Sequence, residues 1–177
     1  MGRSLFAAAA AAALVTACSS MGTDGAMAGL EMPADPTPEQ RNAYVAMAAS
    51  SDMYEIQSGQ LAASRAQNAA VRSFGQMLVA HHTDTTQQLT AAAQASGAPM
   101  PAGMLPLHAE LLSRLQAQSG AEFDRTFKMQ QVMAHEMALA LHRNYASNGD
   151  TPALRTVAAA ATPIIQQHLT QARQLPR

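Results

Sequence analysis

Four residues of metal-ligating type stand in four separate long segments of the sequence: Glu55, His82, His135 and His168. Three imidazoles and one carboxylate form a three-nitrogen, one-oxygen set that suits zinc, copper or iron. A buried imidazole or carboxylate needs a partner, and these groups can partner one another through a cation or through hydrogen bonds alone. The set therefore indicates either a site for one divalent transition metal or a metal-free polar layer that fixes helix register.

The four residues lie at similar depths in the helices that would carry them. Glu55 precedes the first expected turn by about 12 residues, and His82 follows it by about 14. His135 is about 14 residues into its helix, and His168 about 17 into the last one. Because a helix rises about 1.5 Å per residue, all four fall near mid-bundle within roughly two turns. We therefore expect one shared site.

Hydrophobic periodicity predicts the helices that must position this set. Long helices are expected over about 39–66, 69–96, 121–147 and 152–174, and a short amphipathic helix over 107–118. Thr37 is the expected cap of the first helix, Ser119 with Glu122 forms a capping-box pattern, and Gly149 is an expected left-handed stop. Short outer turns and a long middle connection predict an all-α fold, a ferritin-like four-helix bundle with a short extra helix in the 2–3 crossover.

Periodicity leaves some neighbours of the set undecided. His81 and His82 flank the apolar stripe of their helix almost symmetrically, so that one is expected inside and the other at the boundary or surface. Gln131 and Asp124 share the His135 face and are candidate outer acceptors. His108, near the start of the short helix, is expected at the surface.

Methionines form a second stripe on the same helix as His135, at Met129, Met133 and Met137. Thioethers are copper ligands, but methionine at helical spacing is more often core filling, which is the interpretation we adopt. The set of Glu55 and the three histidines stays the only metal site that the sequence predicts.

The N-terminus has the form of a lipoprotein signal. Residues 1–17 contain a short apolar run and end in Leu14-Val15-Thr16-Ala17, followed by Cys18, which resembles the bacterial lipobox. Cys18 is the single cysteine, so a disulfide framework is excluded and lipidation explains it. Residues 18–38 are predicted to be a flexible tether and residues 39–177 the bundle. Ser19, which follows the cysteine, implies the outer membrane under the usual bacterial sorting rule.

Composition narrows the function further. The net charge of −1 gives no electrostatic basis for nucleic-acid binding, so the membrane, reached through the lipid anchor, is the partner expected. The sequence contains no recognisable nucleophile–base pair, phosphate loop or carboxylate dyad, which argues against an enzyme. We expect an envelope lipoprotein on the periplasmic face that binds one metal ion, or alternatively a structural or interaction module with a metal-free polar layer.

Several motifs together resemble the bacterial ferritin-like envelope family called domain of unknown function 4142. They are the run from Glu55 to Ala62, Met77-Leu78-Val79-Ala80-His81-His82, Phe123-Asp124, His135, and Pro163-Ile164-Ile165-Gln166-Gln167-His168-Leu169. The resemblance implies a ferritin-like bundle in the envelope and supplies no established activity. The family usually has Asp-His at positions 81–82, so the resemblance places the motif histidine at His82.

The chain departs from ferritin-like di-iron proteins, which use Glu-x-x-His pairs. The positions three before His82, His135 and His168 hold no glutamate; they are Val79, Val132 and Ile165. Too few carboxylates remain to bridge two irons, so di-iron oxidation chemistry is not expected.

Overall fold

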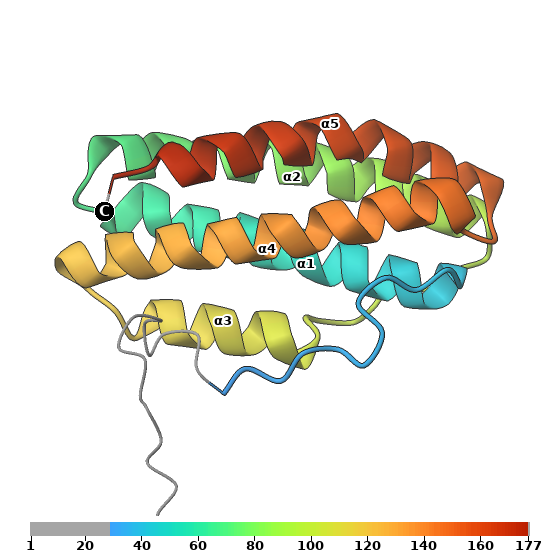
Figure 1. Cartoon of the computed structure of the whole chain (residues 1–177), viewed down its shortest axis with the longest axis horizontal. Coiled ribbons are helices and arrows are strands. Elements are labelled where there is room, and N and C mark those ends of the chain that lie inside the picture. Colours follow the sequence, from blue (N-terminus) through green and yellow to red (C-terminus); the bar gives the residue numbers. More distant parts are fainter. Residues whose placement is uncertain (1–28, 177) are drawn as a thin grey trace, which may run out of the picture.

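The computed structural model describes residues 29–176, and within them the chain forms five helices (Figure 1). They are α1 (Arg41–Arg65), α2 (Ala69–Ala95), α3 (Pro106–Gln116), α4 (Gly120–Asn148) and α5 (Pro152–Gln174). The predicted all-α bundle is confirmed, and each predicted helix is present to within a few residues. The described part of the chain has no strands.

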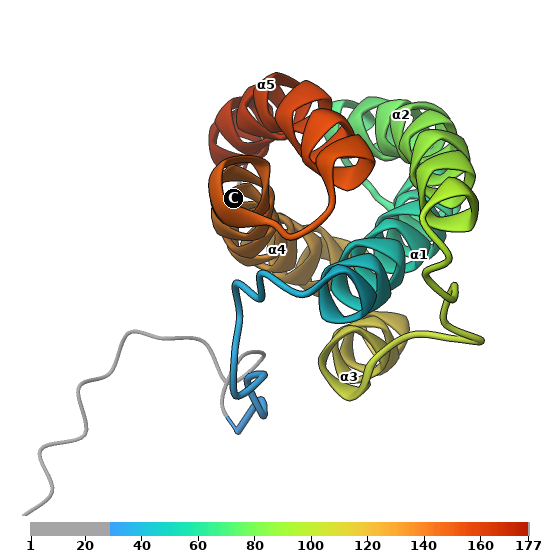
Figure 2. The same ribbon diagram turned by 90° about the vertical axis from the view of Figure 1, so that its right-hand side faces the viewer.

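Four long helices pack around a common axis, and the fifth lies outside them (Figure 2). Around the bundle the order is α1, α2, α5, α4, and α3 lies against α1 on the outer side. The pairs α1–α2 and α4–α5 are each joined by a short turn, whereas the connection from α2 to α4 is long and contains α3. The crossover helix therefore sits where the sequence placed it.

Two glycines allow α1 and α2 to approach closely. A Cβ on Gly59 would lie 2.7 Å from the carbonyl oxygen of Gly75, and a Cβ on Gly75 would lie 2.6 Å from that of Gly59. No side chain fits at either position without moving the backbone. This contact fixes the spacing of the two helices that carry Asp52, Glu55 and His82.

The interior divides into two apolar layers with a polar layer between them. One end is packed by residues such as Tyr44, Leu141 and Tyr145, and the other by residues such as Phe74 and Phe127. The buried polar residues of the middle layer are Asp52, Glu55, Ser58, His82, Gln131, His135 and His168. The apolar layers separate this middle layer from bulk water at both ends of the bundle, so its polar groups depend mainly on one another.

The start of α1 differs from the expectation that Thr37 caps it. The helix begins at Arg41 after Gln40, which makes no side-chain cap bond. Instead, Asp150 accepts a hydrogen bond from the Arg41 amide at 3.1 Å, and its own amide donates to the Glu39 carbonyl. The turn between α4 and α5 therefore supplies the cap, a long-range contact that local sequence does not reveal.

Two further capping predictions are wrong. Ser119 stands at the N-cap of α4, but its side chain makes no cap bond, and Glu122 pairs with Arg125 instead. Gly149 follows α4 with a φ of −58°, outside the left-handed region. Position 149 requires glycine for a different reason, because a Cβ at this position would lie 2.5 Å from the Tyr145 ring.

The predicted signal peptide and Cys18 lie outside the described residues, as does most of the tether. The part of the predicted tether that is described, residues 29–38, is irregular, and Leu30 packs against the core cluster around α3. Among the helices of the described region, none is both long and apolar enough to cross a membrane.

Candidate metal centre

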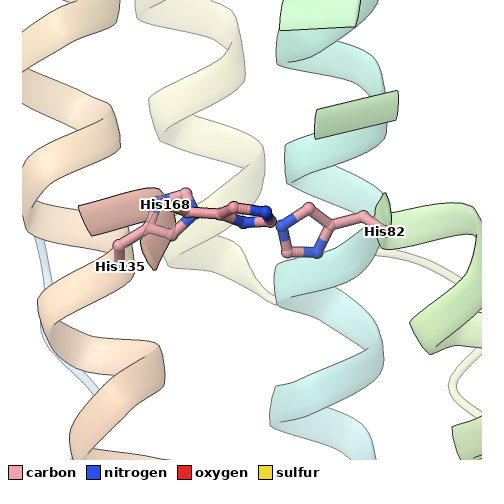
Figure 3. Close-up of side chains that lie close together, drawn as sticks. All are labelled: His82, His135 and His168. Carbon is pink, nitrogen blue, oxygen red and sulfur yellow. The ribbon is translucent and has the colours of Figure 1, made fainter. Parts of the chain in front are cut away.

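Three histidines from three helices meet in the middle layer (Figure 3). His82 comes from α2, His135 from α4 and His168 from α5, and each offers one ligand nitrogen within 4.8 Å of the other two. Their exposed fractions are 6%, 1% and 1%. Three of the four predicted residues therefore converge in one desolvated cluster, and the fourth, Glu55, lies beside it.

Asp52 orients the His82 ring. The Nδ1 of His82 donates to Oδ1 of Asp52 at 2.7 Å, and Thr85 and Thr86 donate to the same carboxylate. The opposite ring nitrogen, Nε2, is buried and has no hydrogen-bond partner. A histidine held by a carboxylate with its other nitrogen free has the arrangement of a metal ligand with its outer acceptor.

A backbone carbonyl determines the tautomer of His135. Its Nδ1 lies 2.8 Å from the carbonyl oxygen of Gln131, one turn earlier in α4. A carbonyl only accepts, so Nδ1 carries the proton and Nε2 presents a lone pair. The sequence predicts Gln131 as an outer acceptor. In the structure the acceptor is the backbone carbonyl of Gln131, and its side-chain amide donates a hydrogen bond to Ser58 instead.

The contact between His135 and His168 has the dimensions of two ligands on one ion. Nε2 of His135 lies 3.4 Å from Nδ1 of His168, which is long for a hydrogen bond. Two nitrogens bound at about 2.0–2.1 Å with a tetrahedral angle lie about 3.3–3.4 Å apart. The ligand nitrogen of His82 lies within 4.8 Å of the other two, so side-chain adjustment can complete the site around an ion.

Glu55 is buried on the α1 side of the cluster and does not reach water. Its exposed fraction is 1%, its Oε1 lies 3.7 Å from Nδ1 of His135, and its Oε2 has no partner. Its carboxylate oxygens are not among the ligand atoms that lie within 4.8 Å of one another, which all belong to the three histidines. Of the four buried side-chain polar atoms without partners in residues 29–176, three belong to this layer, on Glu55, His82 and Gln131.

Burial disfavours charge on most of the site. Burial, followed by the charge of His82, lowers the pKa of His135 to about 3. Burial, followed by the neighbouring imidazoles, lowers the pKa of His168 to about 2. Burial raises the pKa of Glu55 to about 7. His82 is the exception. Burial alone would lower its pKa, but the hydrogen bond and the charge of Asp52 outweigh burial, so that the pKa of His82 is raised.

His81 also reaches the cluster, from the side facing solvent. It is half-buried, its Nδ1 lies 2.8 Å from Nε2 of His168, and the two rings are nearly parallel, with centroids 5.1 Å apart. The structure thus places His82 inside and His81 at the boundary. Sequence analysis did not foresee that the boundary residue would contact a core residue of α5.

The sequence predictions for His108 and Asp124 are wrong, whereas the interpretation of the methionines agrees with the structure. His108 is buried, not exposed, because α3 packs on α1 and brings its Nδ1 to 2.7 Å from Ser50 Oγ. Asp124 is not near the site; its carboxylate accepts from the amides of Gln67 and Asn68 at the α1–α2 turn. Met133 and Met137 pack beside the core cluster around α3, in agreement with core filling.

Sequence analysis missed Asp52. It stands three residues before Glu55 and therefore shares its side of α1, which is a usable signal. The sequence alone does not distinguish Asp52 from an aspartate on a solvent-exposed face, because its partner comes from the neighbouring helix. The buried ion pair with His82 is visible only in the structure.

Comparison with known proteins gives a family. Residues 27–175 match the family described as Domain of unknown function (DUF4142). The chain belongs to this family. No curated protein matches it.

Two solved structures share the fold, both of a protein called CopM. One is described as the Cu(II)-bound form, with a TM-score of 0.63, 19% identity, and coverage of 76% of this chain and 94% of that one. The other is described as the Ag-bound form, obtained by co-crystallization, with a TM-score of 0.61, 18% identity, and coverage of 76% and 93%. At this level of identity the likeness shows a common fold alone.

Proposed function

We propose that this protein binds one divalent transition-metal ion between α2, α4 and α5, with His82, His135 and His168 as ligands. The observation that carries the proposal is a buried nitrogen without a partner, Nε2 of His82, beside two other imidazole nitrogens within 4.8 Å. Orphaned buried polar atoms are costly, and an ion at this point satisfies all three nitrogens together.

Charge balance supports a divalent ion. Three neutral imidazoles contribute no charge, so a buried dication needs anions nearby. Asp52 is hydrogen-bonded to His82, and Glu55 lies beside His135, so two carboxyl groups flank the three histidines. We propose Glu55 as the fourth ligand or the counter-charge, since its free Oε2 has no other partner. Loading would then release the protons held by Glu55 and His82.

Copper is the first candidate among the metals that suit this set. Imidazole ligands bind zinc, copper and iron, and Cu(II) has the highest affinity of the divalent series. The bundles of the same fold have been described with Cu(II) and Ag bound. Zinc and iron remain the alternatives that a competition experiment separates.

Binding, storage or delivery of the ion fits the geometry better than catalysis. The ligands are almost fully buried, and the cavity beside His82, Asp52 and His142 measures about 30 Å³, enough for about one water. A substrate pocket usually measures about 300–1,000 Å³. The proposed role is therefore a metal-binding protein and not an enzyme.

We further propose that the protein is a lipoprotein tethered through Cys18 to the periplasmic face of the envelope, in the outer membrane. The lipobox-like run before Cys18 and the small residue Ser19 after it support this location. Labelling cells with a radioactive fatty acid tests it. Wild type should carry label and partition with membranes, whereas Cys18→Ser should lose both; a membrane-bound, unlabelled wild type would refute it.

The metal proposal is tested on residues 29–177 produced without a tag. Cu(II), Zn(II) and Fe(II) are titrated separately into metal-free protein, and stoichiometry is measured by elemental analysis after desalting. One equivalent of Cu(II) and a rise in melting temperature are expected, because the ion binds only the folded state. A wild-type protein that retains no metal, with an unchanged melting temperature, would favour the metal-free polar layer instead.

A further inference from the structure

His81 is half-buried and is not among the three ligands, yet within the described residues its contact with His168 is shorter than the contact between the two ligands His135 and His168. Its Nδ1 lies 2.8 Å from Nε2 of His168, against 3.4 Å between Nδ1 of His168 and Nε2 of His135. The two nitrogens of His168 therefore face opposite ways. One faces the cluster, and the other faces His81.

A histidine can bind an ion through Nδ1 only if Nδ1 carries no proton. For His168, the proton must then reside on Nε2, and it needs an acceptor there. Nδ1 of His81 is at hydrogen-bonding distance, and the planes of the two rings are inclined by only 14°. The other two ligands have their own acceptors, the Asp52 carboxylate for His82 and the Gln131 carbonyl for His135.

We propose that His81 is the positioning residue for His168 in the metal site. In the ion-bound protein, Nε2–H of His168 donates to Nδ1 of His81, which holds His168 in the tautomer that presents Nδ1 to the ion. The inference rests on the proposed three-histidine site and assigns its third outer acceptor. His81 then carries its own proton on Nε2.

The three outer acceptors differ in whether they can also donate a hydrogen bond. A carboxylate and a carbonyl can only accept, so they impose one tautomer on His82 and His135. An imidazole can also donate, so His81 allows the alternative in which His168 carries its proton on Nδ1. Ion binding selects between these two arrangements, and this makes His168 the ligand most dependent on its outer partner.

Two substitutions separate positioning from packing. His81→Phe keeps an aromatic ring beside His168 but removes the acceptor. His81→Asn places an amide oxygen one bond from Cγ, where Nδ1 stands in histidine. We expect His81→Phe to weaken Cu(II) binding about 10–100-fold, as loss of an outer partner does, and His81→Asn to restore most of it. His108→Asn, which alters a buried histidine outside the site, serves as the matched control and should bind as wild type does.

Nitrogen-15 NMR of the zinc-loaded wild type reads the tautomer directly, and circular dichroism checks that each variant is folded. A protonated Nε2 and a metal-bound Nδ1 on His168 are expected. Nε2 of His168 bound to zinc, or a folded His81→Phe protein that binds Cu(II) within twofold of wild type, would overturn the role of His81. A wild type that binds neither ion would instead overturn the proposed site itself.

Discussion

Two groups of buried histidines in this bundle differ in what their ring nitrogens meet. Nδ1 of His142 lies 3.1 Å from the Tyr44 hydroxyl, and Nδ1 of His108 lies 2.7 Å from the Ser50 hydroxyl. A hydroxyl can donate or accept, so each pair is satisfied with a neutral ring. In the cluster of His82, His135 and His168, nitrogens face nitrogens, and one has no partner.

This difference shows that burial alone does not identify a metal ligand. Burial lowers the pKa of both His108 and His142 to about 4, and it also lowers the pKa of His135 and His168 in the cluster. What distinguishes the cluster is convergence of lone pairs in a layer closed at both ends by apolar packing. The following substitutions and conditions should act on one group and leave the other unchanged.

The largest effect is expected for His168→Ala. Removing one of three ligands should weaken Cu(II) binding at least about 1,000-fold, measured by competition with a chelator of known affinity. His142→Phe, which changes a buried histidine of the other group, should bind within twofold of wild type. Equal losses of Cu(II) affinity in the two variants would contradict the distinction between the two groups of histidines. Both substitutions would then weaken binding by destabilising the fold.

The second effect is a loss of stability of the metal-free protein in acid. The pKa of His108 and of His142 is about 4 in the folded state, against about 6.5 when unfolded. Between these values the unfolded chain binds more protons, so the free energy of unfolding falls as the pH falls from about 6.5 to 4. Each histidine contributes at most about 3 kcal/mol to this fall.

Other groups titrate as well, so the test compares variants. Glu55, whose folded pKa is raised to about 7, and His82, whose pKa is also raised, favour the folded state on protonation and oppose this slope. Urea unfolding from pH 4 to 7.5 should show a shallower fall in the double variant His108→Asn, His142→Gln than in wild type. An identical slope in both proteins would contradict the assignment.

Asp52→Asn should have a smaller effect on binding than loss of a ligand. The amide no longer attracts the proton on Nδ1 of His82 through its charge, so the ring is less well oriented and less basic. We expect Cu(II) affinity to fall about 10–100-fold. Ser50→Ala, which removes the equivalent partner of His108, should leave the affinity unchanged, and isothermal titration calorimetry measures both.

The smallest effect is expected for Tyr44→Phe. It removes the hydroxyl that partners His142 and leaves that ring nitrogen buried without a bond. The free energy of unfolding should fall by about 1–3 kcal/mol, measured by urea denaturation, while metal affinity stays constant. Weaker metal binding in this variant would show that the two groups of histidines are coupled.

Much of the fold was predictable because it depends on local pattern. The helices appear within a few residues of the ranges that periodicity indicates, and α5 begins at Pro152 as expected. Helix ends were less predictable. The cap of α1 comes from Asp150, more than a hundred residues away, and Gly149 is required by the Tyr145 ring and not by a left-handed turn.

The candidate site divides in the same way. Residue spacing and the rise of a helix determined that His82, His135 and His168 lie at one level, because depth along a helix follows from counting residues. Sequence likewise determined that Glu55 belongs to that level. It could not determine which residues at that level face one another, because this depends on how each helix is rotated about its own axis.

Only the tertiary structure decided that rotation. It turned His82 toward the interior and His81 toward the α2–α5 boundary, buried His108 beneath α3, and brought Asp52 to His82. Adjacent residues on a helix differ by about 100°, so a modest rotation exchanges a core position for a boundary one. The rotation is fixed by packing between helices, such as the contact of Gly59 with Gly75, which no single segment of the sequence contains.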